Sequence, residues 1–215
     1  MTTKRLLAFN VIIILLIIFA GFIAYYFYNQ STLYLKTDDA QVTGQQIVIS
    51  APAAGTLASW KATTGSTFSS GDVIGQIQVP AGKTIVASNL TMPSNGTVVQ
   101  DNTFANEFVV PGTPLAYAYD MNNLWINANV KETQIQDVKT GQTVDIYVDA
   151  IPGVTLQGTV SDIGYTTAST FSLLPTQSTT ADYTKVTQVI PVKITLQGTG
   201  INLKPGMSAT VRIHR

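Results

Sequence analysis

The chain has 215 residues, no cysteine, one histidine, and 12 basic against 12 acidic residues, so its formal net charge is zero. The lack of cysteine excludes disulfides, thiolate zinc sites and cysteine nucleophiles, and the absence of a basic cluster argues against a nucleic-acid partner. The single histidine, His214, is expected to be a solvated tail residue. A histidine metal site or a Ser-His-Asp triad is therefore not expected, and the sequence predicts no metal.

The first element is an apolar run of 23 residues, 6–28, without a charged side chain. As a helix it would be about 34 Å long, enough to cross the hydrocarbon core of a bilayer. Lys4 and Arg5 precede it. The positive-inside rule then predicts a cytoplasmic N-terminus at 1–5 and an extracytoplasmic location for the rest of the chain. A cleaved signal peptide is the alternative, but the run is long for one and no A-x-A site follows. We expect a single-pass signal anchor in the cell membrane.

A linker and first barrel strand over 29–46 lead into a motif that occurs twice, 41 residues apart. Each half is a set of short strands that cannot bury its apolar face alone, whereas two halves facing each other can. This predicts one domain at 47–120, with halves at 47–79 and 85–120. The residues that define the motif, and that we expect to shape its turns, are Pro52, Gly55 and Gly71 in the first copy and Pro93, Gly96 and Gly112 in the second. Gly65 and its counterpart Asn106 both tolerate left-handed backbone, which predicts a turn there.

The remaining residues, 121–215, also form short alternating strands separated by Gly, Pro and Asn, which is typical of a small barrel. One short helix is expected at 131–139, and a Ser/Thr-rich loop at 165–184 carries an apolar Phe-Ser-Leu-Leu segment. Those apolar side chains either pack on their own barrel or dock a partner. The fold class predicted is all-β with a single N-terminal transmembrane helix.

The doubled motif resembles the two halves of a lipoyl- or biotinyl-carrier domain, a flattened barrel of two interlocked sheets. Together with the segments that follow, it is similar to the HlyD/EmrA-type membrane fusion proteins, which are periplasmic adaptors of efflux pumps. The segments that carry this resemblance are 37–40, 124–135, 141–144, 171–177, 189–194 and 203–209. They occur in the family's order, from the anchor to the last strand.

This resemblance implies a membrane-anchored, non-enzymatic adaptor without a cofactor. It would dock on the outer face of an EmrB-like major facilitator exporter, form a homo-oligomer, and assist the export of drugs or other small molecules. The family's barrel takes strands from both sides of the lipoyl-like insertion, so 38–44 is expected to join the barrel of 121–215. In most of the family a coiled-coil hairpin between the two halves reaches towards an outer-membrane channel. Here only 80–84 joins them, which implies a short form without that contact, in a bacterium without an outer membrane.

Two other functions stay open at this point. One is an anchored extracytoplasmic module that binds a substrate or cell-wall glycan without a transporter. The other is a carrier domain modified at Lys83, which stands in the hairpin between the halves but lacks the usual carrier flanks. The residues expected to dock on the transporter are Asp38, Asp39, Phe171, Leu173, Leu174 and Gln177.

Overall fold

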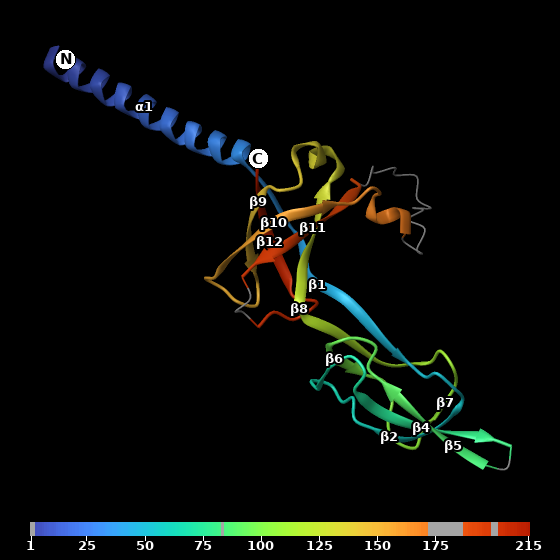
Figure 1. The fold of residues 1–215 in the computed structure, drawn as a ribbon. Coiled ribbons are helices and arrows are strands. Elements are labelled where there is room, and N and C mark those ends of the chain that lie inside the picture. Colours follow the sequence, from blue (N-terminus) through green and yellow to red (C-terminus); the bar gives the residue numbers. More distant parts are fainter. Residues whose placement is uncertain (1–2, 83, 172–186, 199–201) are drawn as a thin grey trace, which may run out of the picture. The chain divides into compact units, whose positions relative to one another are not determined.

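The computed structural model describes residues 3–82, 84–171, 187–198 and 202–215, and within its long helix it describes the side chains of residues 12–26 and 33. The described residues form one α-helix, two short 3-10 helices and twelve strands, which confirms the all-β prediction with an N-terminal helix (Figure 1). The elements are α1 (Thr3–Leu33), β1 (Tyr34–Ser50), β2 (Gly55–Trp60), β3 (Thr67–Phe68), β4 (Val73–Ala81), β5 (Thr84–Thr91), β6 (Gly96–Asp101), β7 (Phe108–Val109), β8 (Pro114–Lys131), η1 (Glu132–Asp137), β9 (Thr143–Val148), β10 (Thr155–Ile163), η2 (Ala168–Phe171), β11 (Val189–Gln197) and β12 (Ser208–His214).

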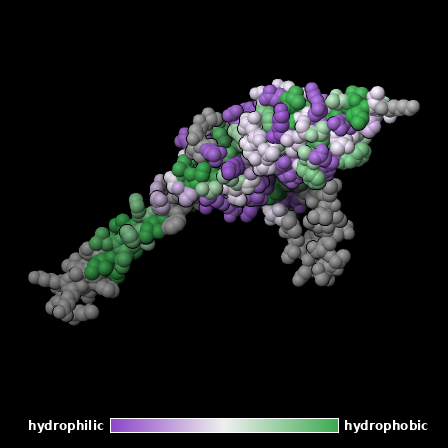
Figure 2. All heavy atoms as spheres, turned by 90° about the horizontal axis from the view of Figure 1, so that it is seen from below, coloured by the Kyte–Doolittle hydropathy of each residue, from purple (hydrophilic) through white to green (hydrophobic). Residues whose placement is uncertain are grey.

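Helix α1 is longer than the apolar run that predicted it. It continues to Leu33, and β1 begins at the next residue, so part of the expected polar linker is helical. Between Ile12 and Tyr26 its side chains are exposed, and Figure 2 shows the hydrophobic residues side by side along it. In the part of the chain that the structure describes, no helix satisfies the length and apolarity needed for a membrane span.

The chain divides into two compact units, which we call the barrel unit and the repeat unit. The barrel unit contains residues 1–40, 128–197 and 209–215, and the repeat unit contains 41–127 and 198–208. The long strands β1 and β8 each contribute one end to each unit.

Six strands of the barrel unit form a closed ring. Their order is β1-β12-β9-β10-β11-β8, and β1 also pairs with β8. Alternation along each strand directs one face inward: Val144, Ile146 and Val148 of β9 are buried, and Ile146 lies opposite Val211 of β12. Closure leaves no free sheet edge among these six strands, as predicted for a small barrel.

In the repeat unit the two halves interlock through equivalent hydrogen bonds. The Gly65 amide donates to the Val98 carbonyl at 2.8 Å, and 41 residues later the Asn106 amide donates to the Leu57 carbonyl at 2.7 Å. Both turn residues have positive φ, 92° for Gly65 and 70° for Asn106, as the sequence predicted. Further matched pairs are Val98 N to Ser66 O with Leu57 N to Glu107 O, Gly71 N to Met92 O with Gly112 N to Ala51 O, and Met92 N to Asp72 O with Ala51 N to Thr113 O. Each half therefore completes the backbone hydrogen bonding of the other.

The hydrophobic core of this unit is shared in the same way. Equivalent residues of the two halves, such as Leu57 with Val98 and Ile74 with Leu115, are all buried in one cluster. Trp60 and its counterpart Asp101 meet directly, since the indole Nε1 donates to the Asp101 Oδ1 at 3.0 Å. A contact between equivalent positions is expected on a two-fold axis, so the unit is a pseudo-symmetric pair.

The connection between the halves is shorter than expected. Strands β4 and β5 pair along their length up to Ala81 opposite Thr84, so that only Gly82 and Lys83 lie between them, and the hairpin extends beyond the rest of its sheet (Figure 1). In the described residues this hairpin is what joins the two halves, without a coiled coil between them.

Gly55 is needed for close backbone approach, whereas a Cβ on Gly96 would first meet the end of the Ile47 side chain at 2.9 Å. Neither has positive φ, in contrast to Gly71 and Gly112 at 88° and 84°. A Cβ on Gly55 would lie 2.2 Å from the Gln78 carbonyl oxygen. Any larger residue must therefore separate β2 from β4.

Replacing Gly55 by Ala should lower the free energy of unfolding by about 3 kcal/mol, because the added methyl meets backbone. Gly44→Ala is the matched control. Its Cβ would first meet the flexible end of the Leu124 side chain, so its effect should be much smaller. Urea unfolding followed by tryptophan fluorescence reports this, since Trp60 and Trp125 both lie in the repeat unit. Equal midpoints for the two variants would contradict the packing argument.

Candidate functional site

The docking residues expected from the sequence lie in two parts of the barrel unit. Asp38 and Asp39 are on β1, and Phe171 is the last residue of η2. Leu173, Leu174 and Gln177 lie outside the described residues, as does Lys83.

The two aspartates of β1 differ in their contacts. The Asn129 side-chain amide donates to the Asp39 carboxylate at 3.1 Å, and the Thr37 hydroxyl donates to the Asn129 carbonyl at 2.9 Å. Asp39 is thereby held against β8, the neighbouring strand. The Asp38 side chain is exposed and makes no hydrogen bond or ion pair with the described residues. Asp38 is the carboxylate of the two that is open to a partner.

The Ser/Thr-rich loop has a defined base. The Glu132 amide of η1 donates to the Gln188 carbonyl at 2.9 Å, and the Ser169 hydroxyl of η2 donates to the Gln188 side-chain oxygen. These bonds hold both ends of the loop next to η1 and β11. Tyr165, at the start of the loop, is 99% exposed. Tyr165 was not among the docking residues predicted from the sequence, although an exposed aromatic residue in a polar loop is itself an indication of a contact surface.

Arg215 links the end of α1 to η1. The Arg215 amide donates to the Leu33 carbonyl at 2.9 Å, and the Arg215 guanidinium lies 3.2 Å from the carboxylate of Asp137, the last residue of η1. Through η1, the end of α1 and the base of the loop belong to one connected set of contacts, which we call the α1-end network. The expected helix at 131–139 is thus present, as a shorter 3-10 helix.

His214 was expected to be a solvated tail residue; its side chain is 41% exposed, but it belongs to a strand and makes side-chain contacts. It is the last residue of β12, where its Nε2 lies 2.9 Å from the Asp145 carboxylate of β9. Its ring meets the Tyr34 ring edge-on at 4.8 Å, and the Arg212 guanidinium lies 4.7 Å from the centre of the same tyrosine ring. Asp145 and Tyr34 are far from His214 in sequence, so its place near the end of the printed sequence could not reveal these contacts. His214 secures the strand that brings Arg215 to α1.

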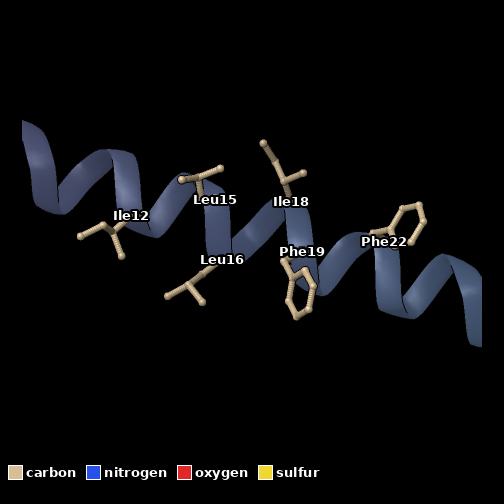
Figure 3. A pocket seen from close by; sticks show the side chains of 6 residues that line it. All are labelled: Ile12, Leu15, Leu16, Ile18, Phe19 and Phe22. Atoms are coloured by element: carbon tan, nitrogen blue, oxygen red, sulfur yellow. The ribbon is translucent and has the colours of Figure 1, made fainter.

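Helix α1 carries a shallow apolar hollow, which is not an enclosed ligand cavity. It is lined by Ile12, Leu15, Leu16, Ile18, Phe19 and Phe22. Figure 3 shows Ile12, Leu16 and Phe19 along one border of this hollow and the other three along the other border. A single helix whose exposed side chains from Ile12 to Tyr26 are mostly apolar has a surface suited to an apolar surrounding.

The chemistry of these surfaces suits contact with another protein. Among the residues described, no group of three or more His, Asp or Glu side chains is placed to hold a metal ion. The barrel unit instead presents an exposed carboxylate at Asp38, an exposed aromatic ring at Tyr165 and a polar loop whose base is held by the α1-end network.

Replacing His214 by Phe should cost about 1 kcal/mol, because the ring contact with Tyr34 is kept and only the hydrogen bond to Asp145 is lost. The cost should appear as faster amide hydrogen exchange in β9 and β12. Asp149→Asn, at an exposed position after β9, is the control and should change stability by less than about 0.5 kcal/mol. Unchanged exchange in the His214 variant would show that this bond adds nothing.

Two family models match this chain. The YhbJ barrel-sandwich hybrid domain covers residues 45–120, and the YknX-like beta-barrel domain covers residues 124–213. Together the two matched ranges cover more than half of the chain. The boundary between them, at 120–124, lies close to the boundary between the two units, at 127–128.

Relatives and a solved structure resemble this chain over different shares of its length. The chain is 43% identical over 213 residues to YhbJ of Bacillus subtilis (strain 168), a candidate efflux system component, covering 99% of this chain and 94% of YhbJ. It is 34% identical to the multidrug export protein EmrA of Escherichia coli (strain K12), over 59% of this chain and 34% of EmrA, so the match spans about a third of that relative. The membrane fusion protein Spr0693 of Streptococcus pneumoniae R6 has the same fold, with a TM-score of 0.57 at 13% identity over 84% of this chain and 98% of that structure.

Proposed function

This chain belongs to the HlyD/EmrA-type membrane fusion proteins, in a short form without the coiled-coil hairpin, and we propose that it docks on the outer face of an EmrB-like major facilitator exporter. It is an adaptor of an efflux system and not an enzyme. The observation that carries the proposal is the 43% identity to YhbJ, because it extends over nearly the whole of both chains. The exported compounds would be drugs or other small molecules.

The anchor of this adaptor would be the apolar run at 6–28. This assignment is supported by the exposed apolar side chains between Ile12 and Tyr26, because exposing an apolar surface of this kind to water is unfavourable. Lys4 and Arg5 before the run favour a cytoplasmic N-terminus, with both compact units outside the cell membrane.

The docking surface would be the α1-end network with the loop that it supports. Arg215 joins the end of α1 to η1, and η1 holds the base of the loop at Gln188. If α1 lies in the membrane, the loop begins close to the membrane surface, at the level of a transporter's outer face. Asp38 and Tyr165 would then contribute charge and aromatic area, together with Phe171, Leu173, Leu174 and Gln177 from the loop.

The short β4–β5 hairpin supports a second part of the proposal. It leaves no coiled coil between the halves, so this adaptor would not reach an outer-membrane channel and would act in a cell envelope with one membrane. Several copies would assemble around the exporter, shape the exit path and favour its outward-facing states.

The first test is affinity purification of the tagged full-length chain from mild-detergent membranes, with mass spectrometry of every retained protein. We expect a stoichiometric transporter of the major facilitator type. Recovery of the chain alone, in a detergent that preserves other pumps, would contradict the exporter proposal and favour an anchored binding module. An ATP-driven pump in place of a facilitator would change the partner class.

A second test addresses the loop. Phe171→Asp combined with Leu174→Asp should reduce transporter recovery at least tenfold, because charged residues cannot fill an apolar contact. Ser172→Asp with Thr176→Asp is the matched control, since it adds the same charge to the same loop and leaves its apolar residues in place. The melting temperature should stay unchanged. A fall in melting temperature with full transporter recovery would show that the apolar residues pack on their own barrel.

A third test concerns the carboxylates of β1. Asp38→Lys should weaken transporter recovery more than Asp39→Lys, because Asp39 is already engaged by Asn129. Asp39→Lys should instead cost a few tenths of a kcal/mol of stability, in keeping with an exposed polar contact. Equal transporter recovery from both variants and the natural chain would remove β1 from the docking surface.

A further inference from the structure

The end of the barrel unit next to α1 carries two basic side chains that pair with no described carboxylate. All 12 acidic residues follow α1, but only 10 of the 12 basic residues do, because Lys4 and Arg5 belong to the helix. The chain after α1 is therefore slightly acidic. Two of its basic residues, Lys36 and Arg212, nevertheless lie close to the helix, at the start of β1 and near the end of β12.

The start of β1 and the end of β12 meet at the end of α1. The two strands are neighbours in the barrel, and the Arg215 amide, directly after β12, donates to the Leu33 carbonyl at 2.9 Å (Figure 1). On β1, Tyr34 and Lys36 share the outer face, because Leu35 between them points into the barrel and is buried. A tyrosine and a lysine therefore stand beside the helix end.

Arg212 is held in place by aromatic contacts and not by a carboxylate. Its guanidinium lies 4.7 Å from the centre of the Tyr34 ring, and that ring meets the His214 ring edge-on. Asp145, which is opposite Arg212 in the sheet, is engaged by His214 at 2.9 Å. The Arg212 guanidinium makes no hydrogen bond or ion pair with the described residues. Its face contacts a ring while its N–H groups stay available to an acceptor.

Most other charged groups at this end are paired or balanced. Arg215 pairs with Asp137 at 3.2 Å, and residues 131–139 contribute two lysines and two acidic residues. Asp38 is the next outward residue of β1 after Lys36, so it lies farther from α1. On the outer face of β1 and β12, the two unpaired charges nearest the helix are therefore both positive.

The length of α1 sets the depth of this face in a bilayer. The apolar run ends at Tyr28, but the helix continues through the polar residues 29–32 to Leu33. The six residues from Tyr28 to Tyr34 correspond to about 9 Å of helix, and the headgroup layer beside the hydrocarbon core is about 5–8 Å thick. If α1 spans the membrane as proposed, Tyr34 lies at the outer border of the headgroups. Long basic side chains on the same face can reach them.

We propose that Arg212 and Lys36 bind the phosphate group of an anionic phospholipid in the adjacent leaflet, with Tyr34 as the positioning residue for Arg212. A guanidinium matches two phosphate oxygens with its planar fork, and the lysine ammonium adds a point charge. A leaflet that contains anionic lipids attracts basic groups within a Debye length of its surface. The contact would hold the end of the barrel unit against the membrane. Only the placement of α1 in the membrane rests on the proposed function.

The test is lipid selection by the full-length chain. The chain is reconstituted into vesicles of equal amounts of phosphatidylcholine and phosphatidylglycerol and extracted in mild detergent, and the co-purified phospholipids are quantified by mass spectrometry. We expect phosphatidylglycerol to be enriched roughly fivefold, the effect of one cation at a charged membrane surface. Arg212→Gln with Lys36→Gln should retain both lipids equally. Lys61→Gln with Lys204→Gln removes two exposed cations of the repeat unit and, as the matched control, should keep the enrichment.

A second pair of variants tests the positioning role of Tyr34 without changing any charge. Tyr34→Phe keeps a ring against the Arg212 guanidinium and should keep the enrichment. Tyr34→Leu removes the ring and should lower the enrichment about twofold to fivefold, although both cations remain. Melting temperatures are measured for all variants, and this pair decides the outcome if the double glutamine variant fails to fold.

Four results would overturn the proposal. They are no enrichment by the natural chain, unchanged enrichment in the double glutamine variant, an equal loss in the repeat-unit control, and displacement of the enriched lipid by inorganic phosphate at constant ionic strength, which means a site for free phosphate. Unchanged enrichment together with reduced transporter recovery would assign the two cations to an acidic group of a partner protein instead. Equal enrichment in the two Tyr34 variants would remove its positioning role.

Failure of this inference is distinguishable from failure of the proposed function. Chain that is recovered in the membrane fraction without lipid enrichment rejects the headgroup contact alone. Chain that is recovered in the soluble fraction rejects the anchor and, with it, the depth on which the headgroup contact depends. Transporter recovery is measured separately, from membranes that contain the exporter.

Discussion

The interlocking of the two repeat halves is the constraint on which the rest of the repeat unit depends. Each half leaves backbone amides and carbonyls that only the other half can satisfy, as the bonds of Gly65 to Val98 and of Asn106 to Leu57 show. Leaving a buried amide unpaired costs more than a hydrogen bond gains, so neither half is stable without its partner. The shared core, in which equivalent residues meet, adds the hydrophobic contribution to the same requirement.

This mutual dependence explains which changes the unit tolerates. The last β4 residue paired with β2 is Gln78, and from Val79 outward β4 pairs with β5 alone, so the length of this outer part can change without disturbing the interlock. A two-residue connection and a long insertion are both compatible with the same core. The exposed residues of the two turns can likewise differ in chemistry without disturbing the interlock. The first copy uses Thr and Ser where the second uses Phe and Val, with no change in backbone.

The barrel unit depends on contacts of a different kind. Closure of the six strands pairs the backbone groups that a sheet edge would leave open. Polar contacts at the ends of the strands then hold the end of α1, Arg215 and the base of the loop against the barrel. Arg215 bonds to Leu33 and pairs with Asp137, while Glu132 holds Gln188. Individually such exposed contacts contribute little to stability. Together they determine where the chain leaves α1 and where the loop begins, which is the surface that we propose for docking.

The sequence by itself determined the repeat, its 41-residue period, the all-β class, the N-terminal helix and the left-handed turns at Gly65 and Asn106. These follow from local chemistry: glycine and asparagine at turns, alternation along strands and one long apolar run. The tertiary structure alone decided the pairing of His214 with Asp145, the engagement of Asp39 by Asn129, and the close approach at Gly55. It also decided that η1 would join α1 to the loop. Each of these contacts joins residues that are well separated in the chain. Closure of the barrel and interlocking of the halves decide which distant residues become neighbours, and a local sequence pattern carries no information about that.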